Sequence, residues 1–360
     1  MSEPDRLDPI HWPETTVLVT GGTGSLGRSL TRLLLKKYKP KGLRIFSRDE
    51  WKQWQMRQEI EELGGNVSFL IGDVRDSQRL RRAMEGVDLV FHAAAMKQVP
   101  ACEYNPLEAV KTNILGAENV LNGALDTGVS RVLNVTTDKA VNPANLYGAT
   151  KLCAEKIFIH GNSYSGARPT VFSCCRYGNV IDSRGSVSSL FRKQRQTGRL
   201  TITDVRMTRF MITQDSVARF LLRCVEMMRG GEIFVPKMSS LSIVDLAKTV
   251  APECRLEVIG IRPGEKIHEC LITREESRLT LECEEMFIIL PNLEWADPSA
   301  YPIPGCRLAS IKRGEFSYTS DANDHWLGPD EVTEMLAEEA RSPAPVSHLR
   351  SVSKPVRTKE

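Results

Sequence analysis

Residues 16–38 combine a short apolar run, a glycine-rich turn and a segment with helical periodicity. The run TVLVT is followed by GGTGSLGRSLTRLLLKKY, in which Gly21, Gly24 and Gly27 stand at three-residue intervals. Glycine lets the backbone approach a pyrophosphate closely, and a helix N-terminus presents unpaired N–H groups to the anion. Because the trio follows an apolar run and opens a helical one, it predicts a dinucleotide site at the start of an α/β fold.

Further apolar runs recur along the chain and alternate with helix-period segments. They are GLRIFS, VSFLIG, DLVFHAA, RVLNVTT and PTVFSCCR. This alternation predicts an α/β fold with a Rossmann-type doubly wound parallel sheet, and the loss of the rhythm near residue 183 predicts a smaller mixed C-terminal substrate lobe. The expected organisation is an irregular lead-in at 1–14, a cofactor-binding Rossmann domain with the catalytic residues at 15–182, a substrate-binding lobe at 183–340 interleaved with the first, and a disordered basic tail at 341–360.

Composition narrows the class of protein. Of 360 residues, 41% are hydrophobic and 26% charged, as in a globular enzyme, and 48 basic against 45 acidic residues favour neither nucleic acid nor a membrane as partner. The nine cysteines show no CxxC pair or metal-type spacing, which predicts reduced thiols, no metal site and a cytoplasmic location. The polar, acidic N-terminus argues against a signal peptide, and the lack of a long apolar run argues against a membrane span.

The second apolar run ends in residues that bear on cofactor choice. A hydroxyl and a guanidinium, Ser47 and Arg48, suit a 2′-phosphate and favour NADP, while Asp49 keeps NAD open. The third run ends in GDVRD, which places Asp73 and Val74 near the adenine, and the fourth ends in small residues. The predicted cofactor contacts are Gly21, Thr23, Gly24, Ser25, Leu26, Gly27, Ser47, Arg48, Asp49, Glu50, Asp73, Val74, Ala93, Tyr147, Lys151 and Val180.

The stretch TTDKAVNPANLYGATK at 136–151 carries acid–base groups. Tyr147 and Lys151 are four residues apart, which places both on one face of a helix beginning near Leu146. An ammonium beside the phenol is expected to lower its pKa, so that Tyr147 can exchange a proton during alcohol oxidation. With the glycine motif, Asn113 and Thr137, this pattern resembles the extended short-chain dehydrogenase/reductase superfamily, in which a Ser/Thr, Tyr and Lys act together.

Asp138 and Lys139 are ionisable groups beyond those an oxidation needs. If C4 of a hexose is oxidised, the C5 proton becomes acidic and the C6 hydroxyl becomes a leaving group, so a base and an acid could eliminate water before the hydride returns to C6. The scheme requires a neutral Lys139 and a protonated Asp138. A water-excluding pocket and the Lys151 cation are expected to push Lys139 in that direction.

The resemblance becomes narrower when further motifs are read together. HAAAMKQVP, EYNPLEAVKTNILGA, RYGNV, SRGSV, TDVRMTRF, GGEIFVP and IRPGEK, with those above, are similar to the 5-inverting UDP-N-acetylglucosamine 4,6-dehydratases of the pseudaminic acid pathway. Retaining sugar-nucleotide dehydratases carry Asp-Glu after the Thr, where this chain has Asp-Lys. The resemblance covers residues from about Thr16 to about Leu336 and departs at Gln98, where His is expected.

The family resemblance implies roles for individual residues. Lys139 would take the C5 proton, Asp138 would handle the C6 oxygen, and Tyr147 with Lys151 and Thr137 would serve C4 oxidation. It also implies UDP-N-acetylglucosamine as substrate, NADP as cofactor and a homo-oligomer, a hexamer in this family. The implied substrate contacts are Lys97, Asn179, Arg184, Gly185, Ser186, Val187, Arg262 and Glu265.

Two alternatives are compatible with the residues. An epimerase or reductase of the same fold would use Thr137, Tyr147 and Lys151 without elimination. A non-catalytic dinucleotide-binding regulator would need none of them, and the presence of Tyr147 and Lys151 argues against it.

Overall fold

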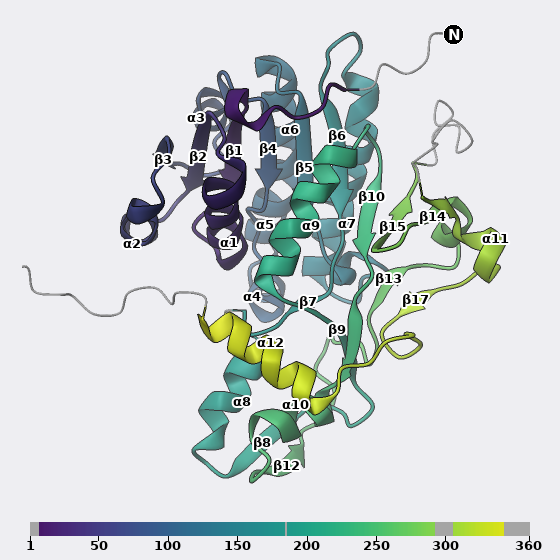
Figure 1. The fold of residues 1–360 in the computed structure, drawn as a ribbon. Coiled ribbons are helices and arrows are strands. Elements are labelled where there is room, and N and C mark those ends of the chain that lie inside the picture. The colour runs from purple at the N-terminus through teal and green to yellow at the C-terminus, as the bar shows by residue number, and fades with distance from the viewer. Residues whose placement is uncertain (1–6, 184–185, 292–304, 342–360) are drawn as a thin grey trace, which may run out of the picture.

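The computed structural model describes residues 7–183, 186–291 and 305–341, and a ten-stranded sheet lies at their centre (Figure 1). The strand order is β16-β14-β15-β10-β6-β5-β4-β1-β2-β3. The strands are β1 (Thr16–Thr20), β2 (Gly42–Ser47), β3 (Val67–Ile71), β4 (Leu89–His92), β5 (Arg131–Val135), β6 (Val171–Cys175), β10 (Ile233–Pro236), β14 (Thr280–Glu282), β15 (Met286–Ile289) and β16 (Arg307–Leu308).

From β3 across to β10 every neighbouring pair of strands is parallel. The order 3-2-1-4-5-6 is that of a doubly wound Rossmann sheet, so the predicted fold class is confirmed. Beyond β10 the strands β15, β14 and β16 add in antiparallel fashion. The predicted second region at 183–340 is therefore divided, because part of it extends the central sheet and part forms a separate lobe.

Helices cover both faces of the sheet. The main helices around it are α1 (Ser25–Leu33), α2 (Glu50–Ile60), α3 (Ser77–Met84), α4 (Val99–Tyr104), α5 (Pro106–Val110), α6 (Gly116–Thr127), α7 (Leu146–Gly161) and α9 (Gln214–Met227). On one face α1 packs against α9, and on the other α6 packs against α3 and α7 (Figure 1). Strands buried on both faces read as unbroken apolar runs, which explains the sequence pattern of β1 and β4.

The smaller lobe has its own core of residues such as Phe191, Leu200 and Leu246. Its sheets pair β7 (Asn179–Val180), β9 (Thr208–Ile212) and β11 (Ser239–Ser242), then β8 (Arg199–Ile202) with β12 (Arg255–Val258), then β13 (Cys270–Ile272) with β17 (Tyr318–Thr319). Its helices are α8 (Val187–Arg195), α10 (Ile243–Val250) and α12 (Pro329–Arg341), while α11 (Ala309–Arg313) packs beside β14.

Short helical turns complete the described chain. They are η1 (Trp12–Glu14), η2 (Leu34–Tyr38), η3 (Glu61–Leu63), η4 (Lys111–Leu115), η5 (Asp138–Ala140), η6 (Asn162–Tyr164) and η7 (Glu276–Leu279). The predicted lead-in at 1–14 is described from residue 7 and ends in η1. Of the predicted tail at 341–360, Arg341 closes α12, which corrects that boundary by one residue, and the rest lies outside the described residues.

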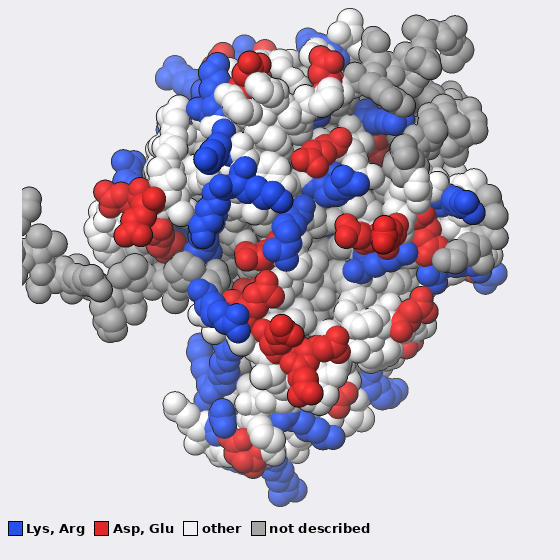
Figure 2. Space-filling view, viewed as in Figure 1, with Lys and Arg blue, Asp and Glu red and all other residues white. Residues whose placement is uncertain are grey.

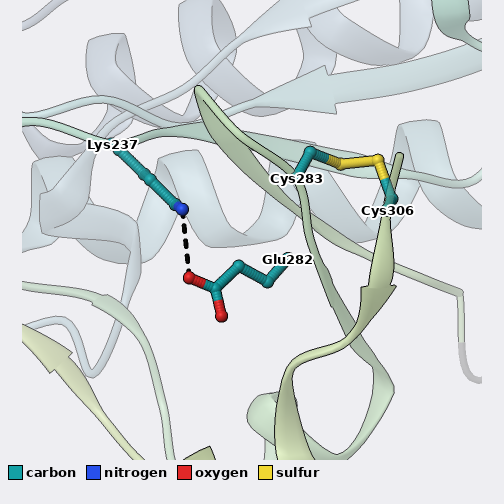
Figure 3. Close-up of a disulfide and its surroundings, with 4 residues drawn as sticks. All are labelled: Lys237, Glu282, Cys283 and Cys306. Carbon is teal, nitrogen blue, oxygen red and sulfur yellow. Dashed lines mark hydrogen bonds and ion pairs between the residues drawn. A yellow bond between two sulfur atoms is a disulfide. The ribbon is translucent and has the colours of Figure 1, made fainter. Parts of the chain in front are cut away.

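One disulfide contradicts the prediction that the cysteines are reduced. Cys283 follows β14, Cys306 precedes β16, and their sulfur atoms are bonded (Figure 3). The two strands pair antiparallel, so residues 23 apart in the chain become neighbours across a ladder. Close by, the Glu282 carboxylate forms an ion pair with the Lys237 ammonium at 3.0 Å (Figure 3). It forms a second ion pair with the Arg313 guanidinium at 2.9 Å. The other seven cysteines are free thiols.

Charged side chains of both signs are interspersed on the face shown in Figure 2, and acidic ones gather over α12. On the described part of this face, basic side chains gather over α1 and α9 (Figure 2). Within 7–183, 186–291 and 305–341, every helix is too short or too polar to cross a bilayer.

Candidate active site

A cavity of about 520 Å³ lies at the carboxyl ends of β1, β2, β4, β5 and β6. Ligands of doubly wound sheets bind at this edge. Most residues predicted to be functional line it, namely Gly21, Thr23, Gly24, Ser25, Leu26, Gly27, Ser47, Arg48, Asp49, Asp73, Val74, Ala93, Lys97, Thr137, Lys139, Tyr147, Lys151, Asn179, Val180 and Ser186.

Some predicted residues lie elsewhere. Asp138, Glu50, Val187, Arg262 and Glu265 do not line the cavity, and Arg184 and Gly185 lie outside the described residues. Glu50 is the exposed first residue of α2, and its cofactor contact stays a prediction. Val187 begins α8, one residue beyond the cavity lining.

The glycine-rich turn has room only for glycine. Gly21 has a φ of 67°, and a Cβ there would lie 2.8 Å from the backbone of Ala94. At Gly27 a Cβ would meet the carbonyl oxygen of Gly22 at 2.3 Å, because α1 passes directly over the end of β1. The turn therefore leaves the N-terminus of α1 open to the cavity, where a pyrophosphate would fit.

The end of β2 supplies cations to the same cavity. Asp49 caps α2 by accepting from the backbone N–H of Lys52, and its carboxylate also lies 2.7 Å from the Lys52 ammonium. The Ser47 hydroxyl accepts from the Gln53 amide at 3.0 Å. Arg48 is largely exposed, with its guanidinium 3.7 Å from the Asp73 carboxylate. Asp49 is thus engaged within its own helix, while Arg48 and Lys52 face the cavity.

The predicted catalytic stretch, residues 136–151, runs from the end of β5 into α7. After β5 the chain forms η5, and α7 begins at Leu146 as predicted, with the Asn145 side chain capping the N–H of Gly148. Tyr147 and Lys151 therefore occupy successive turns of one helix. Gly148 is required here because a Cβ would lie 2.0 Å from the carbonyl oxygen of Lys139. This close contact holds η5 against the first turn of α7.

Asp138 and Lys139 interact with each other in the structure. Asp138 is fully buried, and its Oδ1 atom accepts from the Thr137 hydroxyl at 2.9 Å and from Lys139 Nζ at 3.0 Å. Its Oδ2 atom is buried and meets no hydrogen-bond partner among the described residues. Lys139 Nζ also lies 3.4 Å from the Asn179 side-chain oxygen. An unpartnered buried carboxylate oxygen is a favourable place for a proton.

The pKa of Lys139 shifts against the prediction, whereas the pKa of Asp138 shifts in the predicted direction. Burial opposes the charge on Lys139, but the carboxylates of Asp138 and Glu269 outweigh it and raise its pKa. Burial raises the pKa of Asp138, against the attraction of Lys139 and with support from Glu269. The cation that lowers the pKa of Lys139 is Arg209, and not Lys151 as expected. In the free protein Lys139 therefore holds its proton as an ammonium.

Tyr147 also departs from its expected titration. Burial raises its pKa to about 12, although the Lys139 ammonium and a hydrogen bond with Thr137 act in the opposite direction. Burial likewise lowers the pKa of Lys151, so this helix-spaced cation is weakened. The prediction that Lys151 lowers the pKa of Tyr147 is wrong for the protein without ligands, because desolvation dominates.

Glu269 was missed by the sequence analysis. Its carboxylate is almost fully buried, with Oε1 3.4 Å from Lys139 Nζ and 3.7 Å from Arg209 Nε. Its Oε2 lies 3.8 Å from the Lys266 ammonium. The motif IRPGEK ends three residues before Glu269, but neither spacing nor periodicity links that position to residues 130 places earlier.

The IRPGEK loop contacts the catalytic stretch. Asn145 donates its side-chain amide to the carbonyl of Gly264 at 2.8 Å, and Lys266 donates to the carbonyl of Val141 at 2.5 Å. Arg262 and Glu265 form a partly exposed pair 3.7 Å apart in this loop. Gln98 lines the cavity beside Lys97 at the start of α4. His, Cys, Asp and Glu side chains of the described residues form no group of three suited to a metal ion.

Comparisons with known proteins agree with this architecture. The family model described as polysaccharide biosynthesis protein matches residues 17–291. A Campylobacter jejuni protein named UDP-N-acetylglucosamine 4,6-dehydratase (inverting) is 46% identical over 325 residues, covering 89% of this chain and 96% of that protein. A Rickettsia canadensis protein named UDP-glucose 4-epimerase is 39% identical, covering 90% and 95%.

A solved structure is also similar over nearly the whole fold. The X-ray structure of Pen from Bacillus thuringiensis superposes with a TM-score of 0.84 at 36% identity, covering 92% of this chain and 99% of that one. The identities and the extent of the match are those of members of one family. The chain belongs to the polysaccharide biosynthesis protein family, within the extended short-chain dehydrogenase/reductase superfamily.

Proposed function

We propose that the protein is an NADP-dependent, C5-inverting UDP-N-acetylglucosamine 4,6-dehydratase that yields UDP-2-acetamido-2,6-dideoxy-β-L-arabino-hex-4-ulose. The observation that carries this proposal is the 3.0 Å contact of the fully buried Asp138 with Lys139, which lines the same cavity as Tyr147. Oxidation alone needs only Thr137, Tyr147 and Lys151. The 46% identity to an inverting dehydratase supports an elimination role for the additional pair.

The proposed reaction begins at C4 of the sugar. Gly21, Gly24 and Gly27 would hold a nicotinamide cofactor at this cavity, and it would supply hydride acceptance at C4 and hydride donation at C6. Tyr147, deprotonated in the active complex, accepts the proton of the C4 hydroxyl, and the resulting ketone makes the C5 proton acidic. The Lys139 ammonium and Thr137 both lower the pKa of Tyr147, and so favour this step against the effect of burial.

Elimination then uses the adjacent pair. Neutral Lys139 takes the C5 proton, while protonated Asp138 gives its proton to the C6 oxygen, which leaves as water. After hydride addition at C6, a solvent-derived proton on the opposite face of C5 completes the inversion. The pair ends as ammonium and carboxylate, which is its state before the reaction.

The required neutral pair is reached by one proton transfer. In the free protein the proton resides on Lys139, and Asp138 Oδ1 is the acceptor 3.0 Å away. Burial raises the pKa of Asp138, and this lowers the cost of moving the proton onto it. Such a transfer inside a coupled pair changes neither the total charge nor the number of bound protons.

We assign NADP as cofactor on the charges at the end of β2. Asp49, which could hold the ribose hydroxyls of NAD, already caps α2 and pairs with Lys52. Arg48 and Lys52 line the cavity and suit a 2′-phosphate. A cytoplasmic location fits a reaction on a nucleotide-linked sugar, and the product would enter the synthesis of pseudaminic acid or a related 6-deoxy amino sugar.

A homo-oligomer, expected to be a hexamer, forms part of the proposal. Large apolar side chains on the surface support it: Trp51 and Trp54 stack 4.8 Å apart on α2 while both remain about half exposed. Tyr104 and Leu107, at α4 and α5, are 88% and 70% exposed. Light scattering on the purified protein would give the assembly, and a monomeric mass would contradict this part of the proposal.

The reaction is tested in deuterated water with enzyme and UDP-N-acetylglucosamine, without added cofactor. We expect loss of one water, one deuterium at C5 and no net NADPH. An unchanged sugar mass would instead favour a 4-epimerase. This alternative is supported by the 39% identity to a protein named UDP-glucose 4-epimerase. Accumulation of NADPH would favour a simple dehydrogenase.

A further inference from the structure

The buried carboxylate of Glu269 reaches the catalytic stretch from the opposite lobe. Glu269 immediately precedes β13, and its backbone is held by Ser320, whose hydroxyl accepts from the Glu269 N–H at 2.9 Å and whose N–H donates to the Glu269 carbonyl at 2.8 Å. Its side chain extends to Lys139, leaving Oε1 3.4 Å from Nζ. The ammonium thus lies between two buried carboxylates, those of Asp138 and Glu269.

Two further cations flank Glu269. Arg209 Nε lies 3.7 Å from Oε1, and Lys266 Nζ lies 3.8 Å from Oε2. Arg209 is itself fixed, because its guanidinium donates to the backbone carbonyls of Thr208, Lys266 and Ile267. When Lys139 gives up its proton, Glu269 therefore still has two cations beside it. A buried carboxylate left without a partner would strongly oppose that step.

We infer that Glu269 is a positioning residue for the proposed elimination, which holds Lys139 Nζ between the lobes, and that Arg209 and Lys266 keep Glu269 ionised after Lys139 becomes neutral. The inference rests on the proposed function, in which Lys139 removes the C5 proton. The contact between the lobes then affects catalysis. β13 and β17 fix the position of Glu269, and Glu269 holds Lys139, which lies in the turn after β5.

The charge on Glu269 also sets the pH range in which the pair can work. The active pair carries one proton, shared between Asp138 and Lys139, and is lost by protonation at low pH and by deprotonation at high pH. The charged and titratable groups around the pair are Tyr147, Arg209, Lys266 and Glu269, with Cys102 beyond Tyr147. His268, next in sequence, is hydrogen-bonded to Thr208. A carboxylate at this distance raises both apparent pKa values of the pair.

The test compares Glu269→Gln, which keeps shape and removes charge, with Glu269→Asp, which keeps charge and shortens the reach. Glu257→Gln, an exposed change on β12, is the matched control. For Glu269→Gln we expect kcat for dehydration to fall about 10-fold to 100-fold with little change in KM, as for a misplaced catalytic group. The bell-shaped pH profile should move to lower pH by about one unit or more.

Glu269→Asp should slow C5 exchange, while its remaining activity keeps the wild-type pH profile. It also tests the inference if the Gln variant does not fold. A wild-type rate and pH profile in Glu269→Gln, or a full rate in Glu269→Asp, would overturn the inference. Wild-type protein that neither releases water nor incorporates deuterium would refute the proposed function instead. The two failures are therefore distinct.

Discussion

Lys139 Nζ lies 3.0 Å from the Oδ1 atom of Asp138, its neighbour in the chain. Adjacent residues on a strand point to opposite faces, but β5 has ended at Val135 and η5 turns both side chains to one side. Thr137 caps this turn and also donates to Asp138. The short η5 turn therefore brings these two ionisable side chains together.

Replacing Lys139 with Met should remove the proposed C5 base and leave the cofactor site intact. We expect dehydration and C5 deuterium exchange to fall about 100-fold to 10,000-fold, the range for loss of a general base. Partial C4 oxidation should remain visible as slow reduction of bound cofactor at 340 nm. Lys36→Met, an exposed change in η2, serves as control. Equal loss of oxidation and exchange would contradict a role confined to elimination.

Cofactor preference should depend on Arg48 and Lys52. Removing either cation weakens the attraction for a 2′-phosphate, so Arg48→Ala and Lys52→Ala should each weaken NADP binding about tenfold, or ~1.4 kcal/mol, with less effect on NAD. Fluorescence titration with the reduced forms, NADPH and NADH, compares the two affinities. Lys52→Ala keeps the α2 cap but removes the ion pair with Asp49, so its result is interpreted together with that of Arg48→Ala, which leaves this pair in place. Equal affinity of the wild-type protein for NAD and NADP would refute the assignment.

Much of the sheet could be predicted because local pattern and topology agree. The runs TVLVT, GLRIFS and RVLNV became β1, β2 and β5 within one or two residues, since parallel strands buried on both faces are apolar throughout. The tight turn at Gly21 could also be predicted, because the glycine spacing directly after the apolar run is a local signal. The antiparallel strands β14 and β16 are only two or three residues long, too short to leave a periodic signal.

The parts of the site that were missed depend on distance and burial. Glu269 contacts Lys139 from another lobe, and no local pattern specifies that contact. The pKa of Tyr147 was predicted to fall because a neighbouring charge can be read from spacing, whereas the extent of burial cannot. The bond between Cys283 and Cys306 likewise required the pairing of β14 with β16 to be known.

The buried guanidinium of Arg176 should be important for stability. It lies 2.8 Å from Glu155 on α7 and 2.8 Å from Glu276 in η7, and it donates to the carbonyl of Leu271. Arg176→Met would leave two carboxylates without their cation, at a cost of about 3–5 kcal/mol in the free energy of unfolding. Thermal unfolding measures the loss. Arg199→Met, at an exposed position, should change little, and a similar loss in both variants would contradict the argument.

Acid stability should depend on Glu282. Hydrogen bonds from Arg313 lower its pKa from the ordinary 4.5 to about 2, with Lys237 contributing further. A depressed folded-state pKa means that the stabilisation is present above pH 4.5 and is lost as pH falls towards 2. Wild-type protein should therefore lose roughly 2 kcal/mol more than Glu282→Gln across this window, allowing for partial screening. Parallel acid-unfolding curves for the two proteins would show that Glu282 contributes nothing.

The disulfide should stabilise the fold without affecting catalysis. Cys283 and Cys306 join the end of β14 to the start of β16, and neither lines the cavity. The cross-link closes a loop with a sequence separation of 23, which in the chain-entropy model contributes about 3 kcal/mol. Cys283→Ser should lower the melting temperature under oxidising conditions, while kcat and KM stay at wild-type values. Under a reducing agent the wild-type protein and the variant should have the same melting temperature, because both then lack the cross-link. Cys254→Ser, at a free thiol, controls for the substitution itself. If Cys283→Ser had the same melting temperature as the oxidised wild-type protein, the disulfide would contribute no stability.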